Sequence, residues 1–515
     1  MVALSRLPWI GWLPLLPDEA YYWDWSRRLD LGYFDHPFLA ALVIHATTAI
    51  GGATPVGVRA GMVLLGLGVV VMAYRLAALL GGRLAGWIAL IAAAACPLYA
   101  LLSLYAAPDG PLLFLWAATV YAVCRAVMTG QGRYWYVAGA MLGLALLSKY
   151  VAILLVPSIL LFVALFQRGW LRRREPYLAA LGALLVFSPN LWWNLRHGWI
   201  SIRYQLSHGA CQGAGSMGER LGTAAIYIGT QIGIVGPLLA LLLSMGIIIA
   251  VIMGLRDRPH PRFRGAVGAS DAGALLLLTC CAVVPSLFFL AVDGLVHWAA
   301  PAYFSAIVCL AVVAARLWDR AGRRRRTMLV ALGAVTALTT AAESGYLLRA
   351  VTTNTRLPSF VGAAVDPTLI NPALGWRAVA RDVDAVLAGL APGERRSAVV
   401  LADSYGTAAE LAFYLDGHPR VYSGSNQYSL WGLPSGAHGP LVLVSNAGTL
   451  ATISGPLRRG ARIARTTTTQ AGNQPLRRLE IAVLRPPAGT DPAALGAVLT
   501  DAWRVAATGC EGSGR

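Results

Sequence analysis

The residues best suited to chemistry lie near the start of the chain, between prolines 17 and 37. This stretch reads PDEAYYWDWSRRLDLGYFDHP and contains an adjacent acid pair, Asp18 and Glu19. A carboxylate can take the proton from an attacking hydroxyl group, and nearby cations can hold a phosphate leaving group. We therefore predict a general base here, for transfer from a phosphate-linked donor. A helix N-terminus, where acids are also favoured, is the structural alternative.

Other polar residues stand in short connectors between apolar runs. Asp35 and His36 precede Pro37 and would form the polar rim of a pocket, and Asp109 would face them as a second carboxylate. Lys149 is the only lysine of the chain, and its compact ammonium group suits a lipid phosphate. His297, beside a tryptophan, could line the donor site.

Each of these residues also has a structural interpretation. Asp35 and His36 could form a simple turn, and Asp109 could cap a helix. Lys149 could be a snorkelling lysine and His297 an interface anchor. Together, the acids and histidines could hold a divalent cation, although no spacing among them is specific for one.

The composition is that of an integral membrane protein. Of the 515 residues, 57% are hydrophobic and only 13% are charged, and the mean hydropathy is +0.60. The net charge of +18 comes from arginines between apolar spans, which argues against a nucleic-acid-binding face. Residues 1–16 are apolar but short for a bilayer, and we expect them to belong to a first membrane helix.

The apolar spans predict a topology in which the connectors with acids, histidines and aromatics all lie on one side of the membrane. Arginine-rich connectors alternate with connectors that carry acids, histidines and aromatics, so the positive-inside rule places the second set outside the cytoplasm. The aromatic run after Glu19 is expected to lie at the membrane interface, and residues 38–50 to form a short interfacial helix. The predicted spans are 57–80, 84–104, 109–128, 134–148, 150–167, 177–193, 223–253, 272–292, 299–316 and 327–347.

After residue 347 no apolar run is long enough to span a membrane. Short β-like runs occur at 397–401, 441–445 and 479–484, and residues 375–390 have the period of an amphipathic helix. We therefore predict two domains. Residues 1–347 would form a transmembrane catalytic domain with its first extracytoplasmic loop at 17–37, and residues 348–515 an extracytoplasmic α/β domain.

Several segments resemble the ArnT-like and protein-O-mannosyltransferase family. That family consists of polyprenyl-phosphate-sugar-dependent glycosyltransferases of the GT-C fold. The chain departs from the family pattern at its short N-terminus, since the family has a full helix before the acid pair. The segments that carry the resemblance are 17–37, APDGPLLFLWA at 107–117, GLALLSKY at 143–150, SPNLWWNLRHGWISIRYQL at 188–206, VHWAAPAYFSA at 296–306 and ADSYGTAAELAFYL at 402–415.

The resemblance implies a mainly α polytopic protein of GT-C type with about 10–12 transmembrane helices and an extracytoplasmic α/β domain. It implies inverting transfer of a sugar from a polyprenyl phosphate, in the plasma membrane, to lipid A, another glycolipid, a polysaccharide or a protein. Asp18 matches the family's catalytic acid, and Glu19 is its neighbour. Tyr405 is expected to bind substrate, in a segment that faces the membrane and touches the acceptor, with Ser404, Glu410 and residues 426–428.

Two other classes of protein remain open on the sequence. A transporter or flippase of lipid-linked sugars would place ionisable residues near the bilayer midplane and show repeated halves. The acids here stand at span ends, and no repeat is visible. A non-catalytic scaffold that uses the outer domain is the third class.

Overall fold

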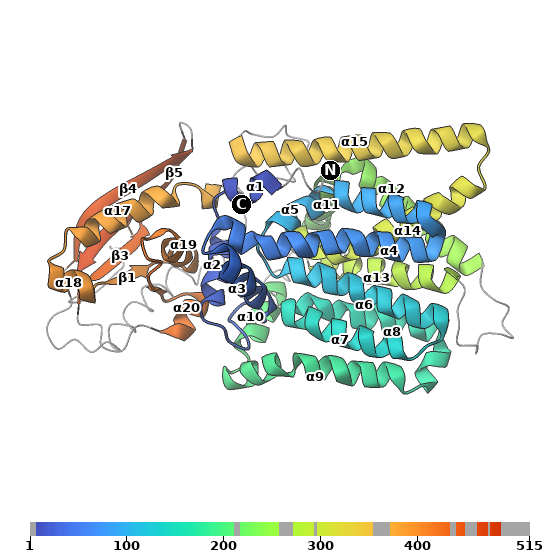
Figure 1. Ribbon diagram of the computed structural model, residues 1–515, viewed down its shortest axis with the longest axis horizontal. Coiled ribbons are helices and arrows are strands. Elements are labelled where there is room, and N and C mark those ends of the chain that lie inside the picture. The colour runs from blue at the N-terminus through green and yellow to red at the C-terminus, as the bar shows by residue number, and fades with distance from the viewer. Residues whose placement is uncertain are drawn as a thin grey trace.

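A computed structural model describes residues 7–210, 217–256, 271–292, 296–353, 371–432, 439–448, 461–471 and 474–485. A bundle of long helices stands on one side of the molecule and a sheet domain on the other, with α2 and α3 at the junction (Figure 1). The predicted mainly α membrane architecture with a C-terminal α/β part is confirmed. Within the described ranges, seven helices are long and apolar enough to cross a membrane: α4 (Pro55–Ala95), α6 (Asp109–Thr129), α9 (Glu175–Arg196), α12 (Pro237–Arg256), α13 (Asp271–Val292), α14 (Ala300–Asp319) and α15 (Arg323–Thr353).

Helix α4 contains two of the predicted spans because its chain reverses direction inside it. Gly81 and Gly82 leave helical geometry, and Gly82 has a φ of +78°, which favours glycine. Past this point the chain packs back on itself, since a Cβ on Gly86 would lie 2.9 Å from that of Ala78. The return limb continues into α5 (Pro97–Leu104).

The remaining predicted spans also coincide with helices, with one correction. Residues 134–148 and 150–167 match the shorter α7 (Arg133–Ser148) and the pair η2 (Tyr150–Leu154) and α8 (Leu155–Phe166). The span predicted at 223–253 is instead divided at Gly236 into α11 (Met217–Val235) and α12. Gly236 has a φ of +96°, and a Cβ there would clash with the carboxylate of Glu343. The left-handed φ of Gly236 and the proline that follows it explain the break, and the close approach of Glu343 explains why position 236 is glycine.

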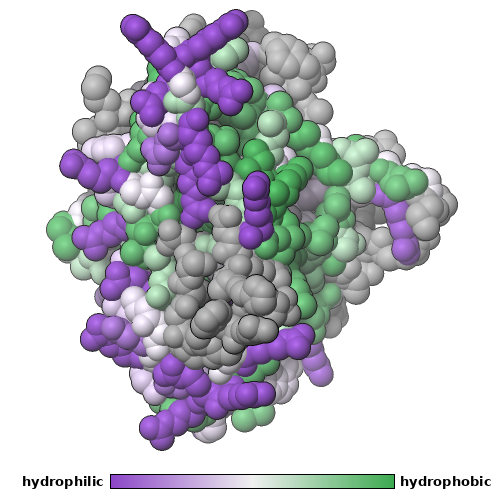
Figure 2. Space-filling model, turned by 90° about the vertical axis from the view of Figure 1, so that its right-hand side faces the viewer, coloured by the Kyte–Doolittle hydropathy of each residue, from purple (hydrophilic) through white to green (hydrophobic). Residues whose placement is uncertain are grey.

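The two predicted sets of connectors lie at opposite ends of the bundle. At the end beside the sheet domain, Asp109 reaches Lys149 and His297. At the far end, Arg173 donates to the carbonyl of Gly130. Hydrophilic side chains are visible at that far end (Figure 2). Its exposed arginines are Arg83, Arg133, Arg168, Arg172, Arg174, Arg320 and Arg323–Arg326.

The outer domain is built on a five-stranded sheet of order β2-β1-β3-β5-β4. The predicted runs correspond to β1 (Val399–Ala402), β3 (Leu441–Asn446) and β5 (Gln474–Leu484), and the sequence analysis missed β2 (Val421–Ser423) and β4 (Ala461–Ala471). Strands β2, β1 and β3 run parallel, whereas β5 and β4 are antiparallel to their neighbours. The predicted amphipathic helix is α17 (Trp376–Ala388), which precedes the short α18 (Pro392–Ser397).

Parallel strands bring their carboxyl ends to one edge of the sheet, where ligands bind in open α/β sheets. From this edge the chain enters α19 (Tyr405–Tyr414) after β1 and α20 (Asn426–Trp431) after β2. Both helices begin beside the N-terminal segment, where α19 packs on α2 (Pro17–Ser26). The sheet edge therefore faces the stretch that carries the acid pair (Figure 1).

The aromatic run of the N-terminal stretch is buried inside the protein, which corrects the expectation of side chains exposed to a membrane interface. It belongs to α2, and Tyr21, Tyr22, Trp23 and Trp25 are all buried. They share one apolar core with residues of α17, α19 and the sheet. Tyrosine and tryptophan occur both at membrane interfaces and in domain cores, so the presence of these residues alone does not distinguish the two locations. The helix predicted at 38–50 is α3 (Leu39–Gly51), after the short α1 (Leu7–Trp12).

Candidate active site

Asp18 stands at the start of α2, half-buried, where two tyrosines from different parts of the chain meet it. Tyr105, between α5 and α6, donates its hydroxyl to Oδ2 at 2.9 Å. Tyr405 donates to Oδ1 at 3.0 Å, and Ser404 caps the helix that Tyr405 begins. Burial raises the pKa of Tyr405, and the nearby charge of Asp18 raises it further. Tyr405 therefore remains a neutral donor, and both oxygens of Asp18 are held in fixed directions.

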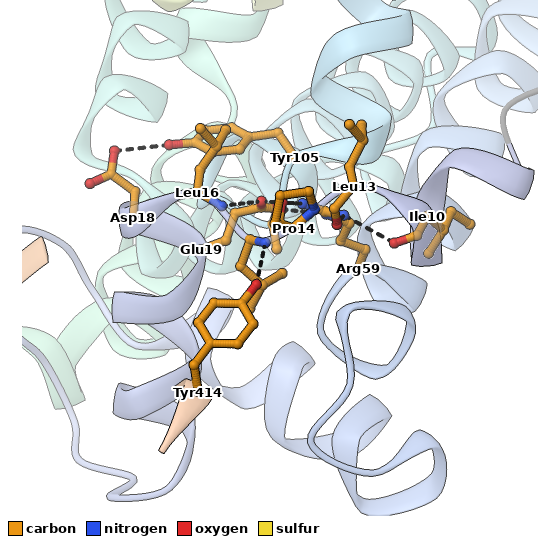
Figure 3. Close-up of polar contacts among 11 residues, drawn as sticks. Ile10, Leu13, Pro14, Leu16, Asp18, Glu19, Arg59, Tyr105 and Tyr414 are labelled. Atoms are coloured by element: carbon orange, nitrogen blue, oxygen red, sulfur yellow. Dashed lines mark hydrogen bonds and ion pairs between the residues drawn. The ribbon is translucent and has the colours of Figure 1, made fainter. Parts of the chain in front are cut away.

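Glu19 points away from Asp18 into a closed network of donors (Figure 3). Arg59 on α4 donates Nε to Oε1 at 2.7 Å and Nη2 to Oε2 at 2.5 Å. The backbone N–H groups of Leu16 and Ala106 also donate hydrogen bonds to this carboxylate. Arg59 is itself saturated, because it also donates to the carbonyls of Ile10, Leu13 and Pro14. Glu19 is fully buried, and its contacts are those of a structural ion pair.

Tyr22, on the next turn of α2, lies among three of the predicted carboxylates. Burial raises its pKa well above the usual value, and the charges of Asp18, Asp35 and Asp109 raise it further. The fold thus gathers acids from three separate segments around one ring. His36 belongs to the same group, with its ring 6.3 Å from that of Tyr22.

Asp35 is held between α2 and the outer domain. Tyr21 donates to its Oδ2 at 2.7 Å, and Asn426 donates to its Oδ1 at 2.8 Å. Gln205 of α10 (Ile200–Ala210) donates to its backbone carbonyl at 2.8 Å. Asn426 has a left-handed φ of +48°, an uncommon conformation for a residue with a side chain and one that often marks functional sites.

Asp109 and Lys149 form a buried ion pair at the end of the helix bundle near Tyr22. Nζ of Lys149 lies 2.9 Å from each carboxylate oxygen, and each side chain is only 4% exposed. Nε2 of His297 is 3.9 Å from the same carboxylate. Lys149 is therefore not a snorkelling lysine at the interface, and Asp109 is the first residue of α6 rather than its N-cap.

Six of the eight predicted site residues lie on or against the first two turns of α2: Asp18, Glu19, Asp35, His36, Asp109 and Tyr405. Lys149 and His297 join them through Asp109. Glu19 stands apart from the others, because it is held in the network with Arg59. The residues expected to face the membrane with Tyr405 instead contact the N-terminal stretch or are buried: Gln427 accepts from the backbone N–H of Phe34, Tyr428 donates to Asp24, and Glu410 is fully buried.

Sequence reasoning missed Arg59, Tyr105 and Gln205. Arg59 could have been found, because an arginine inside an apolar span requires a buried partner. Tyr105 and Gln205 gave no comparable signal. Within the part of the chain that the structure describes, no three or more histidine, cysteine, aspartate or glutamate side chains are placed to hold a metal ion.

Comparisons with known proteins agree with this architecture. Residues 35–193, which include Asp35, His36, Asp109 and Lys149, match the family model described as dolichyl-phosphate-mannose-protein mannosyltransferase. The lipid A galacturonosyltransferase RgtD of Rhizobium johnstonii is 28% identical over 295 residues, which are 56% of this chain and 59% of that protein. The match therefore spans less than two thirds of that relative.

Two crystal structures of ArnT from Cupriavidus metallidurans are similar to this one. The form bound to undecaprenyl phosphate has a TM-score of 0.62 and 18% identity, covering 93% of this chain and 97% of ArnT. The apo form has a TM-score of 0.60 and 16% identity, covering 93% and 96%. The resemblance predicted from the sequence is confirmed, and the chain has the GT-C fold in its ArnT-like form.

Proposed function

We propose that this protein is a membrane glycosyltransferase that moves a sugar from a polyprenyl-phosphate donor to a hydroxyl group of an acceptor, with inversion. One observation carries the proposal. Asp18 is a half-buried carboxylate that tyrosines from two different parts of the chain orient, close to further acids, histidines and a lysine. The ArnT structure with bound undecaprenyl phosphate supports a lipid-phosphate donor for a protein of this fold.

In this proposal Asp18 is the general base. It takes the proton of the acceptor hydroxyl as that oxygen attacks the anomeric carbon, and the polyprenyl phosphate leaves as an anion. Tyr105 and Tyr405 aim the carboxylate at the acceptor. Because the leaving group is already an anion, no protonated acid is needed on its side.

Lys149, His297 and His36 form the donor side of the site. Lys149 has three N–H donors, and Asp109 fixes its position with the two oxygens that it presents. We assign to Lys149 the role of a cation near the donor phosphate, and to the two histidines hydrogen bonds to phosphate or sugar. Glu19 positions the start of α2 through Arg59 rather than taking part in proton transfer.

Asp35 and Asn426 form the acceptor side. A carboxylate and an amide next to tyrosine rings are suited to bind the hydroxyl groups and the apolar face of a sugar. Since Asn426 belongs to the outer domain, acceptor recognition would require both domains. The relative named as a lipid A galacturonosyltransferase makes lipid A the first acceptor to test, before other glycolipids, polysaccharides and proteins.

We place the protein in the plasma membrane, with the site and the outer domain outside the cytoplasm. The arginine-rich end of the bundle, opposite the site, supports this orientation by the positive-inside rule. The alternative of a transporter is less well supported, because Asp18, Asp35 and Asp109 lie at the starts of helices or in connectors and not at mid-span.

The test compares envelope glycolipids and glycoproteins of a deletion strain with those of the parent strain by mass spectrometry. We expect one sugar mass to be missing from one acceptor, and restored by the wild-type protein but not by Asp18→Asn. The purified protein in nanodiscs should then transfer that sugar from its polyprenyl phosphate. Unchanged envelope glycans, together with no transfer in nanodiscs to any acceptor of these classes, would refute the proposal.

A further inference from the structure

Glu410 is a buried acid that the proposed reaction does not use. It lies in the middle of α19, is fully buried, and has no hydrogen-bond partner at either carboxylate oxygen. Helical spacing places it on the same face as Gly406 and Phe413. A Cβ on Gly406 would contact Pro17 at 3.2 Å, and Phe413 packs edge-on against Trp23 at 4.8 Å. Glu410 therefore faces α2.

Most of the charged groups around Glu410 already have partners, and the exception is Nη1 of Arg477, which is buried without a hydrogen bond. On α2 and α4, Glu19 and Arg59 form the ion pair described above, and Asp18 is held by tyrosines. On β5, Arg477 donates Nη2 to the carbonyls of Asn371 and Pro372. The two arginines stabilise a charge on Glu410, whereas Glu19 and Asp18 repel it.

The burial of Glu410 outweighs its attraction to the arginines. Burial is the largest cause, and it raises the pKa of Glu410 well above the usual value. An ionised carboxylate without hydrogen bonds is costly in an interior, so such a group keeps its proton. Burial without hydrogen bonds therefore favours the protonated form of Glu410, and a rise in pH would place a charge within the α19–α2 contact.

The contact between α19 and α2 fixes the orientation of Asp18. At one end of α19, Tyr405 donates to Asp18. At the other end, the hydroxyl of Tyr414 accepts from the backbone N–H of Leu15 at 3.1 Å. Glu410 lies between these two attachments. A negative charge there would be buried without hydrogen bonds in this contact, attracted by Arg477 and Arg59 and repelled by Glu19 and Asp18.

We propose that Glu410 is a positioning residue of the candidate active site, which must remain protonated for α19 to hold Tyr405 against Asp18. This inference rests on the proposed function only for its activity readout. When Glu410 loses its proton to bulk water, α19 would separate from α2, and it would return when the proton is regained. The site would thus lose activity at alkaline pH through a residue that never touches a substrate.

The first test is the pH dependence of kcat for sugar transfer in nanodiscs. Glu410→Gln keeps the shape of the protonated acid but cannot ionise, so we expect wild-type kcat at pH 7 and an alkaline limb at least about one pH unit higher. The matched control is Glu394→Gln, which removes a partly exposed acid of the same domain that pairs with Arg485, and its profile should match the wild type. An unchanged alkaline limb in Glu410→Gln would overturn the inference.

Glu410→Leu provides a second variant with an apolar side chain of similar size. It should also lack the wild-type alkaline limb. If a charged Glu410 paired with Arg477 were required instead, both Glu410 variants would lose kcat at pH 7 while remaining folded, and that result would equally contradict the inference.

Hydrogen exchange separates this inference from the proposed function. At each pH the wild type and Glu410→Gln have the same intrinsic exchange rate, so their difference reports on docking. We expect amides of α19 and α2 to lose protection between pH 7 and 9.5 in the wild type but not in the variant. That result without any glycosyl transfer would refute the proposed function alone. Transfer without any difference in protection would refute the inference alone.

Discussion

Tyr405 of the outer domain donates a hydrogen bond to Asp18, 387 positions earlier in the chain, across 3.0 Å. This contact joins the carboxyl edge of the sheet to the first residues of α2. Because a second tyrosine, Tyr105, comes from the membrane bundle, the proposed base is oriented only when both domains are assembled. The outer domain is thus part of the candidate site itself.

Replacement of Asp18 should abolish transfer without unfolding the protein. Asp18→Asn keeps the side chain's shape but cannot accept a proton, and loss of a general base typically costs about 10²–10⁴-fold in rate. The measurement is kcat in nanodiscs, with thermal unfolding as a check on folding. Asp30→Asn, at an exposed acid of the same stretch, is the control and should retain activity. Wild-type turnover by Asp18→Asn would exclude it as the base.

Tyr405→Phe should lower kcat more than it raises KM for the donor. It removes one hydrogen bond to a carboxylate, and such bonds contribute about 1.5–3 kcal/mol, which corresponds to roughly 10–100-fold in rate. Tyr422→Phe, at a half-buried tyrosine of β2, serves as the control. Equal kcat for both variants would mean that Tyr405 does not orient the base.

Glu19 and Arg59 should behave as a structural pair. Glu19→Gln leaves Arg59 buried with an uncompensated charge, and breaking a buried ion pair costs about 3–5 kcal/mol. We expect a lower unfolding midpoint in detergent and a reduced yield of folded protein. The double variant Glu19→Leu with Arg59→Met should recover part of that stability. A stable but inactive Glu19→Gln protein would instead restore Glu19 as a catalytic candidate.

Lys149 should combine a structural and a binding role. Lys149→Ala isolates Asp109 in a buried site and should weaken donor binding more than Lys149→Arg does, because arginine keeps the charge but not the geometry. Donor KM and kcat of the three proteins are the measurement. The double variant Asp109→Asn with Lys149→Met should fold better than Lys149→Ala yet still bind donor weakly. Equal KM in all three proteins would restrict Lys149 to a structural role.

Asn426 should affect the acceptor and not the donor. Asn426→Ala removes the amide that contacts Asp35, so we expect a raised acceptor KM, while the KM for the polyprenyl-phosphate sugar remains unchanged. Ser429→Ala tests a neighbouring exposed position of the same helix as the control. A change confined to the donor KM would move Asn426 to the donor side of the site.

The sequence by itself determined the membrane spans, their alternation and the existence of an outer α/β part. These features depend on the length and period of apolar runs, which are local properties of the chain. Alternation also predicted that the connectors at Asp109, Lys149 and His297 share one end of the bundle. Their contact at 2.9 and 3.9 Å depends in addition on which helices pack together, and alternation alone did not give that.

Only the tertiary structure decided which of the gathered residues are available for chemistry. Asp18 and Glu19 are adjacent, but neighbours on a helix point about 100° apart, and Arg59, 40 positions after Glu19, engages that acid. The burial of the aromatic run was likewise decided by the tertiary structure, because α19 of the outer domain packs over it. Such contacts depend on residues distant in the chain, and no local pattern in the sequence encodes them.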